Sequence, residues 1–363
     1  MRILHAADLH LDSVFTALPV EKARQRRRES RDLLDKLASL TVEENIDLVL
    51  LPGDLFDGDR VYPETIARLK TALENMNCPV FIAPGNHDPC IRFSPYVRET
   101  WPDNVHIFTS QEVTSVELGA LNCVVHGAAF LDRHRFSEPL EGYAAPKDDR
   151  LHVLCLHGAV DEPGSAYGNI RREQIRESGF DYLALGHVHQ YSGEQLCGGS
   201  IWAYSGCPEG RGFDETGDKG VVIADVWKGH ASLRFFPLNH RCYRVLKTDV
   251  TNCTAAEAME RVIPKTAERD ICRIVFTGET GEEGIDLHAL ETDWAPRFYE
   301  LQLRDETIPT EDIWQRAGEN SLKGLFLRDL RTRYEAATSQ QERNLIISAV
   351  RFGLAAMDGR DLG

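Results

Sequence analysis

The sequence, 363 residues long, lacks the features that mark membrane and secreted proteins. It has no uncharged apolar run near the roughly 20 residues that a membrane-spanning helix needs, and residues 2–7 are predicted to form a strand rather than a signal peptide. Its nine cysteines include no C-x-x-C pair, which favours reduced and mostly buried thiols. We therefore expect a cytoplasmic protein with no membrane association.

The sequence also lacks an excess of positive charge, because its 57 acidic residues outnumber its 41 lysines and arginines. The formal net charge of -16 argues against a protein that holds nucleic acid by its overall charge, because such proteins usually carry a basic stripe. Residues 21–31 do concentrate arginine and could contact a phosphate backbone, although a solvated helix face explains such a run more simply. Any nucleic-acid role therefore needs a local explanation.

The length and the order of apolar runs predict about two domains of the α/β class. Over residues 1–239, short β-branched or leucine-rich runs alternate with helical stretches, the pattern of a layered sheet. Later strands follow one another with no room for helices, which predicts that part of the sheet is antiparallel. The candidate strands are residues 3–6, 48–51, 80–83, 105–108, 153–156 and 182–185, followed by 201–204, 221–226 and 232–237.

The pattern changes after residue 239. Residues 243–250 and 271–277 are predicted strands, and a capping box that starts at Thr254 predicts a helix between them. From Glu311 onward, apolar residues recur at helical spacing. We therefore expect a first domain over residues 1–239, a small α+β domain over 240–308 and a helical region over 309–363.

Polar side chains recur where the candidate strands end. Because the loops at the carboxyl ends of strands converge in layered α/β folds, the segments that carry them are expected to meet in one place. The carboxylate, amide and imidazole residues at these positions are Asp8 and His10, then Asp54, then Asn86 with His87 and Asp88, then His157, and finally His187 with His189.

These motifs differ in specificity. The D-x-H of Asp8 and His10 is weak by itself, and Gly53 before Asp54 could be an ordinary turn at the end of a strand. Residues 84–88, Pro-Gly-Asn-His-Asp, are far more specific, because they combine a tight turn with an amide, an imidazole and a carboxylate. Lone histidines are usually satisfied core or surface residues, whereas five motifs in this order are poorly explained by chance.

In order, D-x-H, G-D-x-x-D, G-N-H-D, H-G and G-H-x-H resemble the calcineurin-like metallophosphoesterase superfamily over about the first 240 residues. Within it, residues 5–12, 53–57 and 180–189 look closest to SbcD-type DNA repair exonucleases, and the second domain matches that type's capping domain in position and size. The resemblance implies a metallophosphoesterase layered αββα sandwich with a small α+β capping domain and C-terminal helices.

The resemblance also implies a centre of two metal ions. Carboxylate, amide and imidazole ligands without a thiolate suit manganese or iron better than a structural zinc. Manganese is the expected metal, with iron or zinc as alternatives. Two divalent ions about 3.5 to 4 Å apart lower the pKa of a bridging water and offset charge on both the attacking and the leaving oxygen. The implied ligands are Asp8, His10 and His189 for one metal, Asn86, His157 and His187 for the second, and Asp54 between the two.

His87 is not needed as a ligand in this scheme. The resemblance makes it the residue that donates a proton or hydrogen bond to the scissile phosphate and leaving oxygen, and Asp88 is expected to orient its imidazole. Some related double-strand-break nucleases carry a histidine where this chain has Asp57, which puts a second histidine contact to the phosphate in doubt. Arg211 and Lys219 could line the groove beside the metals or belong to a flexible turn.

The resemblance leads to the hypothesis of a manganese-dependent DNA nuclease, a homodimer that acts with an SbcC-like coiled-coil ATPase on broken or blocked DNA ends. The C-terminal helices would dock on that ATPase or simply close the small domain. A partner that supplies the DNA-binding surface would reconcile the net charge of -16 with a DNA substrate. The rival is a small-molecule phosphodiesterase or phosphatase with the same metals. A metal-free scaffold is disfavoured because no ligand position is missing, and the choice between exonuclease and endonuclease stays open.

Overall fold

The computed structural model describes residues 1–16, 18–58, 60–280, 284–309 and 314–357. Contacts divide the chain into two compact units. The first comprises Met1–Val245, Thr266–Arg273 and Arg297–Glu300, and the second comprises Leu246–Lys265, Ile274–Pro296 and the described part of Leu301–Gly363. The three-part division expected from the sequence stays a prediction.

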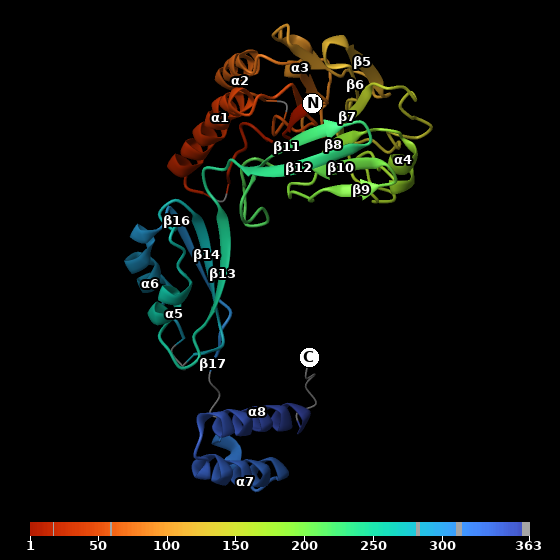
Figure 1. The fold of residues 1–363 in the computed structure, drawn as a ribbon. Coiled ribbons are helices and arrows are strands. Elements are labelled where there is room, and N and C mark those ends of the chain that lie inside the picture. Colours follow the sequence, from red (N-terminus) through yellow and green to blue (C-terminus); the bar gives the residue numbers. More distant parts are fainter. Residues whose placement is uncertain (17, 59, 281–283, 310–313, 358–363) are drawn as a thin grey trace. The chain divides into compact units, whose positions relative to one another are not determined.

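Two six-stranded sheets form the framework of the first unit (Figure 1). The first sheet has the order β12-β11-β1-β2-β3-β4, in which β1 to β4 are parallel and β11 and β12 are antiparallel to their neighbours. Its strands are β1 (Arg2–His5), β2 (Leu48–Leu51), β3 (Val80–Ile82), β4 (Val105–Ile107), β11 (Gly220–Trp227) and β12 (His230–Pro237).

The second sheet has the order β5-β6-β7-β8-β10-β9, with only the outer pairs β5-β6 and β9-β10 antiparallel. The prediction of an antiparallel arrangement is right for β11 and β12, whereas β10 pairs antiparallel with β9 and parallel with β8. The sequence patterns missed β5, β6 and β9. The strands of this sheet are β5 (Thr114–Leu118), β6 (Cys123–Gly127), β7 (Leu151–His157), β8 (Tyr182–Gly186), β9 (Gln195–Cys197) and β10 (Ser200–Tyr204).

The alternation of side chains along the strands builds the layers. In β2, Leu48 and Leu50 face the core between the two sheets, whereas Val49 and Leu51 face the core beneath α1 (Val20–Glu43) and α2 (Pro63–Asn75). The outer face of β7 packs in the same way with Ile175 of α4 (Arg172–Glu177). Figure 1 shows α1 and α2 on one side of the paired sheets and α4 on the other. The expected layered α/β sandwich with mixed sheets is confirmed.

The chain after residue 242 forms a three-stranded sheet of β13 (Tyr243–Asp249), β14 (Ile271–Thr277) and β16 (Glu300–Asp305) in the order β13-β14-β16. The predicted capping box is present, because Glu257 N donates to Thr254 Oγ1 (3.2 Å) and Thr254 N donates to Glu257 Oε2 (2.8 Å) at the start of α5. The other elements are α3 (Pro95–Arg98), α5 (Ala255–Val262), α6 (Leu287–Trp294), the pair β15 (Glu279–Thr280) with β17 (Ile308–Pro309), and 3-10 turns at Gly119–Leu121, Ala295–Arg297 and Gln315–Gly318.

Two helices end the described chain, α7 (Leu322–Ala336) and α8 (Gln340–Met357), and they pack on Leu327 and Val350. The expected C-terminal helices are therefore confirmed, although residues 310–313 and 358–363 of that region lie outside the described residues. Among the residues that the structure describes, no helix is both long and apolar enough to cross a membrane. All nine cysteines are free thiols, and seven of them are buried.

Candidate metal centre

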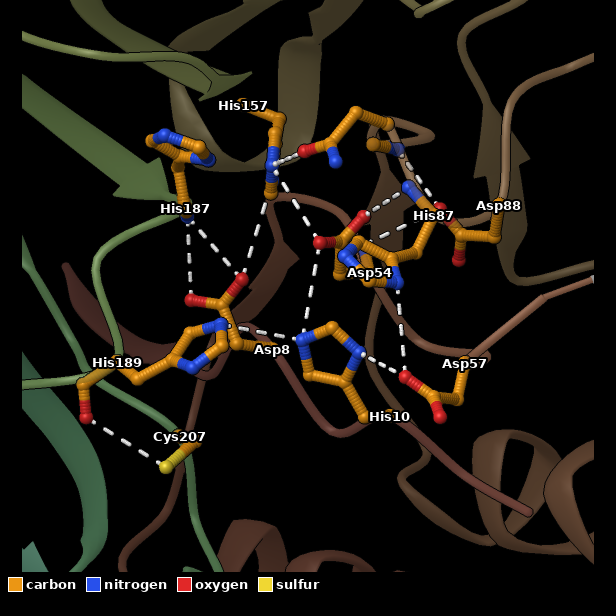
Figure 2. A network of polar contacts seen from close by, with 12 residues as sticks. Asp8, His10, Asp54, Asp57, His87, Asp88, His157, His187, His189 and Cys207 are labelled. Atoms are coloured by element: carbon orange, nitrogen blue, oxygen red, sulfur yellow. Dashed lines mark hydrogen bonds and ion pairs between the residues drawn. The ribbon is translucent and has the colours of Figure 1, made fainter. Parts of the chain in front are cut away.

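The five motif-bearing segments meet because the strands before them are neighbours. β1, β2 and β3 lie side by side in the first sheet, and β7 and β8 do so in the second. Backbone hydrogen bonds join the loops that follow: Asp8 N donates to Gly53 O (3.1 Å), His10 N to Asp54 O (2.9 Å) and Gly158 N to Gly186 O (3.2 Å). Figure 2 shows the side chains from these loops turned toward one another. The predicted convergence is confirmed.

The backbone of the centre is strained at its functional residues. Asp8, His10 and Asp54 have φ angles of 55°, 42° and 52°, and His187 has a φ of 114°. Residues other than glycine rarely adopt positive φ, and such strain persists only where the surrounding structure enforces it. The loops are therefore shaped to aim these side chains, and strain of this kind is typical of functional sites.

Two glycines allow the loops to approach closely. A Cβ atom on Gly53, whose φ is +88°, would lie 2.4 Å from His157 Nδ1, and a Cβ atom on Gly85 would lie 2.2 Å from Asp54 Oδ1. Neither position has room for a larger residue. The glycines in the G-D and G-N-H motifs are thus required by the packing of the imidazole and carboxylate, as well as by their turns.

A first pocket is formed by two imidazoles whose Nε2 atoms face each other. His10 Nε2 lies 3.1 Å from His189 Nε2. The outer nitrogens contact carboxylates, because His10 Nδ1 lies 3.0 Å from Asp57 Oδ1 and His189 Nδ1 lies 2.7 Å from Glu215 Oε1. Carboxylates only accept hydrogen bonds, so each Nδ1 carries the proton and each Nε2 presents a lone pair. Asp8 completes the group, with ligand atoms of all three residues within 4.8 Å of one another.

A second pocket has the same arrangement with different partners. His157 Nδ1 contacts the carbonyl oxygen of Pro52 (3.1 Å), so its Nε2 carries no proton, and that Nε2 faces Asn86 Oδ1 at 2.9 Å. Asp54 Oδ2 lies 3.6 Å from His157 Nε2 and 3.7 Å from His10 Nε2. One carboxylate oxygen therefore lies between the two pockets.

His187 contributes to this region in two ways. Its backbone N–H donates to both carboxylate oxygens of Asp8 (3.1 and 3.2 Å), and its ring lies edge-on to that of His157 at 5.3 Å. Burial lowers the pKa of His157 to about 3, and it lowers the pKa values of His10 and His187 to about 4. These imidazoles are therefore neutral near pH 7, which is the form that binds a metal ion.

The electrostatics of the two pockets favour cations. Burial, followed by the charge of nearby Asp54, raises the pKa of Asp8 well above its usual range. Lone pairs directed at one another, and two buried carboxylates with oxygens within 4.8 Å of each other, are unfavourable unless positive charge lies between them. Carboxylate, imidazole and amide ligands in two adjoining pockets fit two divalent ions. The residues present therefore suit a dimetal site.

His87 lies at the solvent side of the centre, with its side chain 44% exposed. Its backbone N–H donates to Asp54 Oδ1 (2.9 Å), and its Nδ1 lies 3.5 Å from Asp57 Oδ1. The hydrogen bond with Asp57 raises the pKa of His87. Burial alone would raise the pKa of Asp57, but hydrogen bonds from His10 and His87 lower it overall. His87 is thus a solvent-accessible imidazole, and the carboxylate of Asp57 favours its protonated form.

The hydrogen bonds that Asp88 accepts in the described part of the chain do not include one from the imidazole of His87, and its expected role in orienting that imidazole stays a prediction. Its buried carboxylate instead joins the loops after β2 and β3, and the carboxylate beside His87 is that of Asp57. Burial and the charge of Asp54 raise the pKa of Asp88 to about 7. The donors to Asp88 are the backbone N–H groups of Asp54 (3.2 Å), Leu55 (2.7 Å), Phe56 (3.1 Å) and Gly85 (2.8 Å) and the hydroxyl of Tyr96 (2.5 Å).

The loop after β10 supplies residues that the sequence patterns did not assign. Arg211 lies between two carboxylates, with Nη1 3.1 Å from Asp57 Oδ1 and Nη2 2.9 Å from Glu215 Oε1. Lys219 is buried and donates from Nζ to the carbonyl oxygen of His189 (3.0 Å). Both cations therefore hold the centre together rather than line an open groove. The sequence holds one weak signal for Glu215: it lies four residues after Arg211 in a glycine-rich loop, a spacing that allows the two side chains to pair.

The basic run over residues 21–31 lies in α1, and ion pairs occupy much of its charge. Lys22 Nζ lies 2.5 Å from Glu300, and Arg31 Nη1 lies 3.4 Å from Asp12. Arg26 is fully buried between Glu29 (2.8 Å) and Glu209 (2.5 Å). These three side chains stabilise the first unit, so the run offers far less positive charge to a ligand than its sequence indicates.

Comparisons with known proteins agree with this geometry. Residues 1–191 match the family model described as calcineurin-like phosphoesterase. The chain is similar to the uncharacterized metallophosphoesterase YhaO of Bacillus subtilis (strain 168), with 28% identity over 339 residues, 85% of this chain and 82% of that protein. It is 23% identical over 373 residues to the DNA double-strand break repair protein Mre11 of Saccharolobus solfataricus, which covers 97% of this chain and 94% of that one. It is also 25% identical over 274 residues to one of the subunits of the SbcCD nuclease of Bacillus subtilis, which covers 63% of this chain and 67% of that one.

Proposed function

The chain belongs to the calcineurin-like phosphoesterase family and is a metal-dependent phosphoesterase with the dimetal site typical of that family, and we propose that it hydrolyses phosphodiester bonds of DNA. In this proposal the protein is a DNA repair nuclease of the SbcD type. The names of two relatives, a double-strand break repair protein and a nuclease subunit, support DNA as the substrate. Manganese is the proposed metal, because oxygen and nitrogen ligands without a thiolate suit it.

The observation that carries the proposal is the pair of facing contacts on either side of Asp54. In the first pocket, His10 Nε2 lies 3.1 Å from His189 Nε2. In the second pocket, His157 Nε2 lies 2.9 Å from Asn86 Oδ1. We assign Asp8, His10 and His189 to one ion, Asn86, His157 and His187 to the other, and Asp54 to both. When bound, the ions would supply positive charge that activates a water and stabilises the charge on the phosphate.

His87 has the geometry and charge for proton transfer to the leaving oxygen. A ring nitrogen of its exposed imidazole lies within 4.8 Å of a carboxylate oxygen of Asp54, and its Nδ1 lies 3.5 Å from Asp57 Oδ1. Asp57 favours the protonated imidazole, which suits a group that must donate a proton when the ester bond breaks. We therefore propose His87 as the general acid and Asp57 as the residue that orients it.

The C-terminal helices and the acidic composition bear on partners. Leu322, Leu325, Leu345 and Phe352 of α7 and α8 are exposed, as expected of a surface that another protein covers. We propose that an SbcC-like ATPase binds there and supplies DNA-binding surface, and that the assembly contains two copies of this chain. The net charge of -16 is the observation that favours the rival function, a phosphodiesterase for small molecules.

Cleavage of end-labelled single- and double-stranded DNA in Mn²⁺, measured beside a chromogenic phosphodiester, tests the proposal. Shortened DNA is expected, and His87→Ala should abolish it. Calorimetry should detect two Mn²⁺ ions per chain in both the wild-type protein and His87→Ala. Turnover of the chromogenic ester while DNA stays intact, with and without an SbcC-like partner, would instead establish the small-molecule function.

A further inference from the structure

A row of rings leads outward from the metal centre. The ring of Tyr167 lies 5.1 Å from that of His187, with an angle of 39° between the planes. The ring of His134 is stacked on Tyr167 at 6.2 Å and 29°, and it is also stacked on Phe136 at 6.2 Å and 18°. Four rings from three separate segments therefore form a continuous series of contacts that begins at a proposed metal ligand.

Exposure rises along this row. His187 and Tyr167 are half-buried, His134 is exposed, and the side chain of Phe136 is 77% exposed. A large apolar ring such as that of Phe136 is unfavourable in water, so its exposure at the end of a row of aromatic rings beside the metal centre indicates a surface that a ligand covers. Because the rings of His134, Tyr167 and Phe136 are stacked, this surface suits a planar group of a ligand.

Backbone hydrogen bonds fix the row relative to the centre. Ala159 N, two residues beyond His157, donates to the carbonyl oxygen of Tyr167 (3.1 Å). The segment that carries His134 and Phe136 is joined to the Tyr167 loop in turn, because Arg135 N donates to Ala166 O (2.7 Å) and Gly168 N donates to Arg135 O (2.8 Å). The rings are thus positioned before any ligand binds, which reduces the entropy lost on binding.

The charge around the row differs from the acidic average of the protein. Arg135 lies within the segment, 4% exposed, and its Nη1 has no hydrogen-bond partner among the described residues. Two of the neighbouring carboxylates are paired with arginines, Glu138 with Arg171 and Asp161 with Arg172, both at 2.8 Å. An anionic ligand would therefore meet the buried guanidinium of Arg135 here, beside two carboxylates whose charge is already paired.

We propose that Tyr167, His134 and Phe136 form a stacking platform for a nucleobase of the substrate next to the scissile phosphate. This inference rests on the proposed function, since it places the phosphate at the metal centre. Every base has a flat face that stacks on an aromatic ring, so the platform would bind bases with little sequence preference. The base could belong to a nucleic-acid strand or to a single nucleotide ester, and the two sources differ in how binding depends on strand length.

The first experiment compares two phosphodiesters that share a leaving group, the p-nitrophenyl ester of thymidine 5′-phosphate and methyl p-nitrophenyl phosphate. Only the first carries a base. The wild-type protein in Mn²⁺ should prefer the thymidine ester, as measured by the ratio of the two kcat/KM values. Phe136→Ala and His134→Ala should each lower that ratio at least about fivefold, the lower end of what one stacked base contributes.

Phe93→Ala is the matched control. Phe93 is another phenylalanine on a loop of the same unit, 69% exposed and in contact with an arginine, but outside the row of rings. Its removal should leave the ratio unchanged. An equal fall of the ratio in Phe93→Ala, or an unchanged ratio in both Phe136→Ala and His134→Ala with unaltered melting temperatures, would overturn the platform.

The second experiment measures binding without cleavage, by fluorescence anisotropy of labelled oligonucleotides with the His87→Ala protein. Oligothymidylate should bind at least about fivefold more tightly than an abasic strand of the same length and charge, and Phe136→Ala should remove the difference. If the affinity rises with the length of the oligonucleotide, the substrate is a nucleic-acid strand. If a single nucleotide ester binds as tightly as the longer strands, the substrate is a small molecule. Equal binding of the two strands would refute the platform, whereas failure of the wild-type protein to cleave any diester would refute the proposed function.

Discussion

The two pockets of the metal centre are held in different ways. In the first pocket, both imidazoles are supported by carboxylates, His10 by Asp57 (3.0 Å) and His189 by Glu215 (2.7 Å). Arg211 lies between these two carboxylates and contacts both (3.1 and 2.9 Å). The first pocket is therefore the inner part of a charged network, and the same network reaches the proposed general acid through Asp57.

The second pocket has neutral support. The outer nitrogen of His157 contacts the carbonyl oxygen of Pro52, and the group that faces its inner nitrogen is the amide of Asn86. A carboxylate makes the opposite nitrogen of an imidazole more basic than a neutral carbonyl does. We therefore expect the first pocket to bind its divalent ion more tightly than the second, so that the second ion is lost first when metal is limiting.

Asp54→Asn should have the largest effect, because Asp54 is the carboxylate that both pockets share. One of its oxygens lies within 3.7 Å of the inner nitrogen of each pocket. Turnover of a chromogenic diester should fall at least about 1000-fold, equivalent to about 4 kcal/mol of transition-state stabilisation. Calorimetric titration should detect fewer than two Mn²⁺ ions per chain. Two ions bound with wild-type affinity would show that the carboxylate is not shared.

His87→Ala should have the next largest effect and should separate catalysis from metal binding. The loss of a positioned proton donor lowers turnover about 100- to 10,000-fold. Both Mn²⁺ affinities should stay close to wild type, because the imidazole of His87 belongs to neither pocket in our assignment. A diester with a leaving group that needs no protonation should recover much of the lost rate, and the absence of any such recovery would argue against a general acid.

Glu215→Gln tests the difference between the pockets directly. The change removes the charge behind His189, so the Mn²⁺ affinity of the first pocket should fall about 10- to 100-fold. The affinity of the second pocket should change little. The control is Glu117→Gln, which alters an exposed glutamate that pairs with Arg150 and, among the described residues, contacts none of the proposed ligands. If both affinities fell equally, the carboxylates would not explain the difference between the pockets.

The sequence predicted most of what lies inside the two pockets. Each ligand candidate lies at the end of an apolar strand or in the loop that follows it, and both the strand and the motif are local patterns of a few residues. Their convergence followed from the order of strands in layered α/β folds. Asp8, Asn86 and His157 could therefore be proposed without coordinates, and the structure brings them together.

The residues around the pockets could not be predicted in this way. Asp57 is 47 positions from the imidazole of His10, and Glu215 is 26 positions from that of His189. Neither contact leaves a local signature, because it depends on how a loop folds back. The parallel pairing of β10 with β8 could not be predicted for a similar reason: the short strand β9 pairs antiparallel with β10 and lets the chain turn, so that β10 runs parallel to β8.

Asp88→Asn should have the smallest effect on turnover. This variant tests whether Asp57 or Asp88 is the carboxylate that orients the imidazole of His87. Four backbone N–H groups and one hydroxyl donate to Asp88, so an amide nitrogen there would leave buried donors unpaired. The free energy of unfolding of the first unit should fall by about 1 to 3 kcal/mol, seen as a lower melting temperature in calorimetry. If Asp88→Asn instead left the melting temperature unchanged and lowered turnover as far as His87→Ala, then Asp88, and not Asp57, would be the carboxylate that orients the general acid.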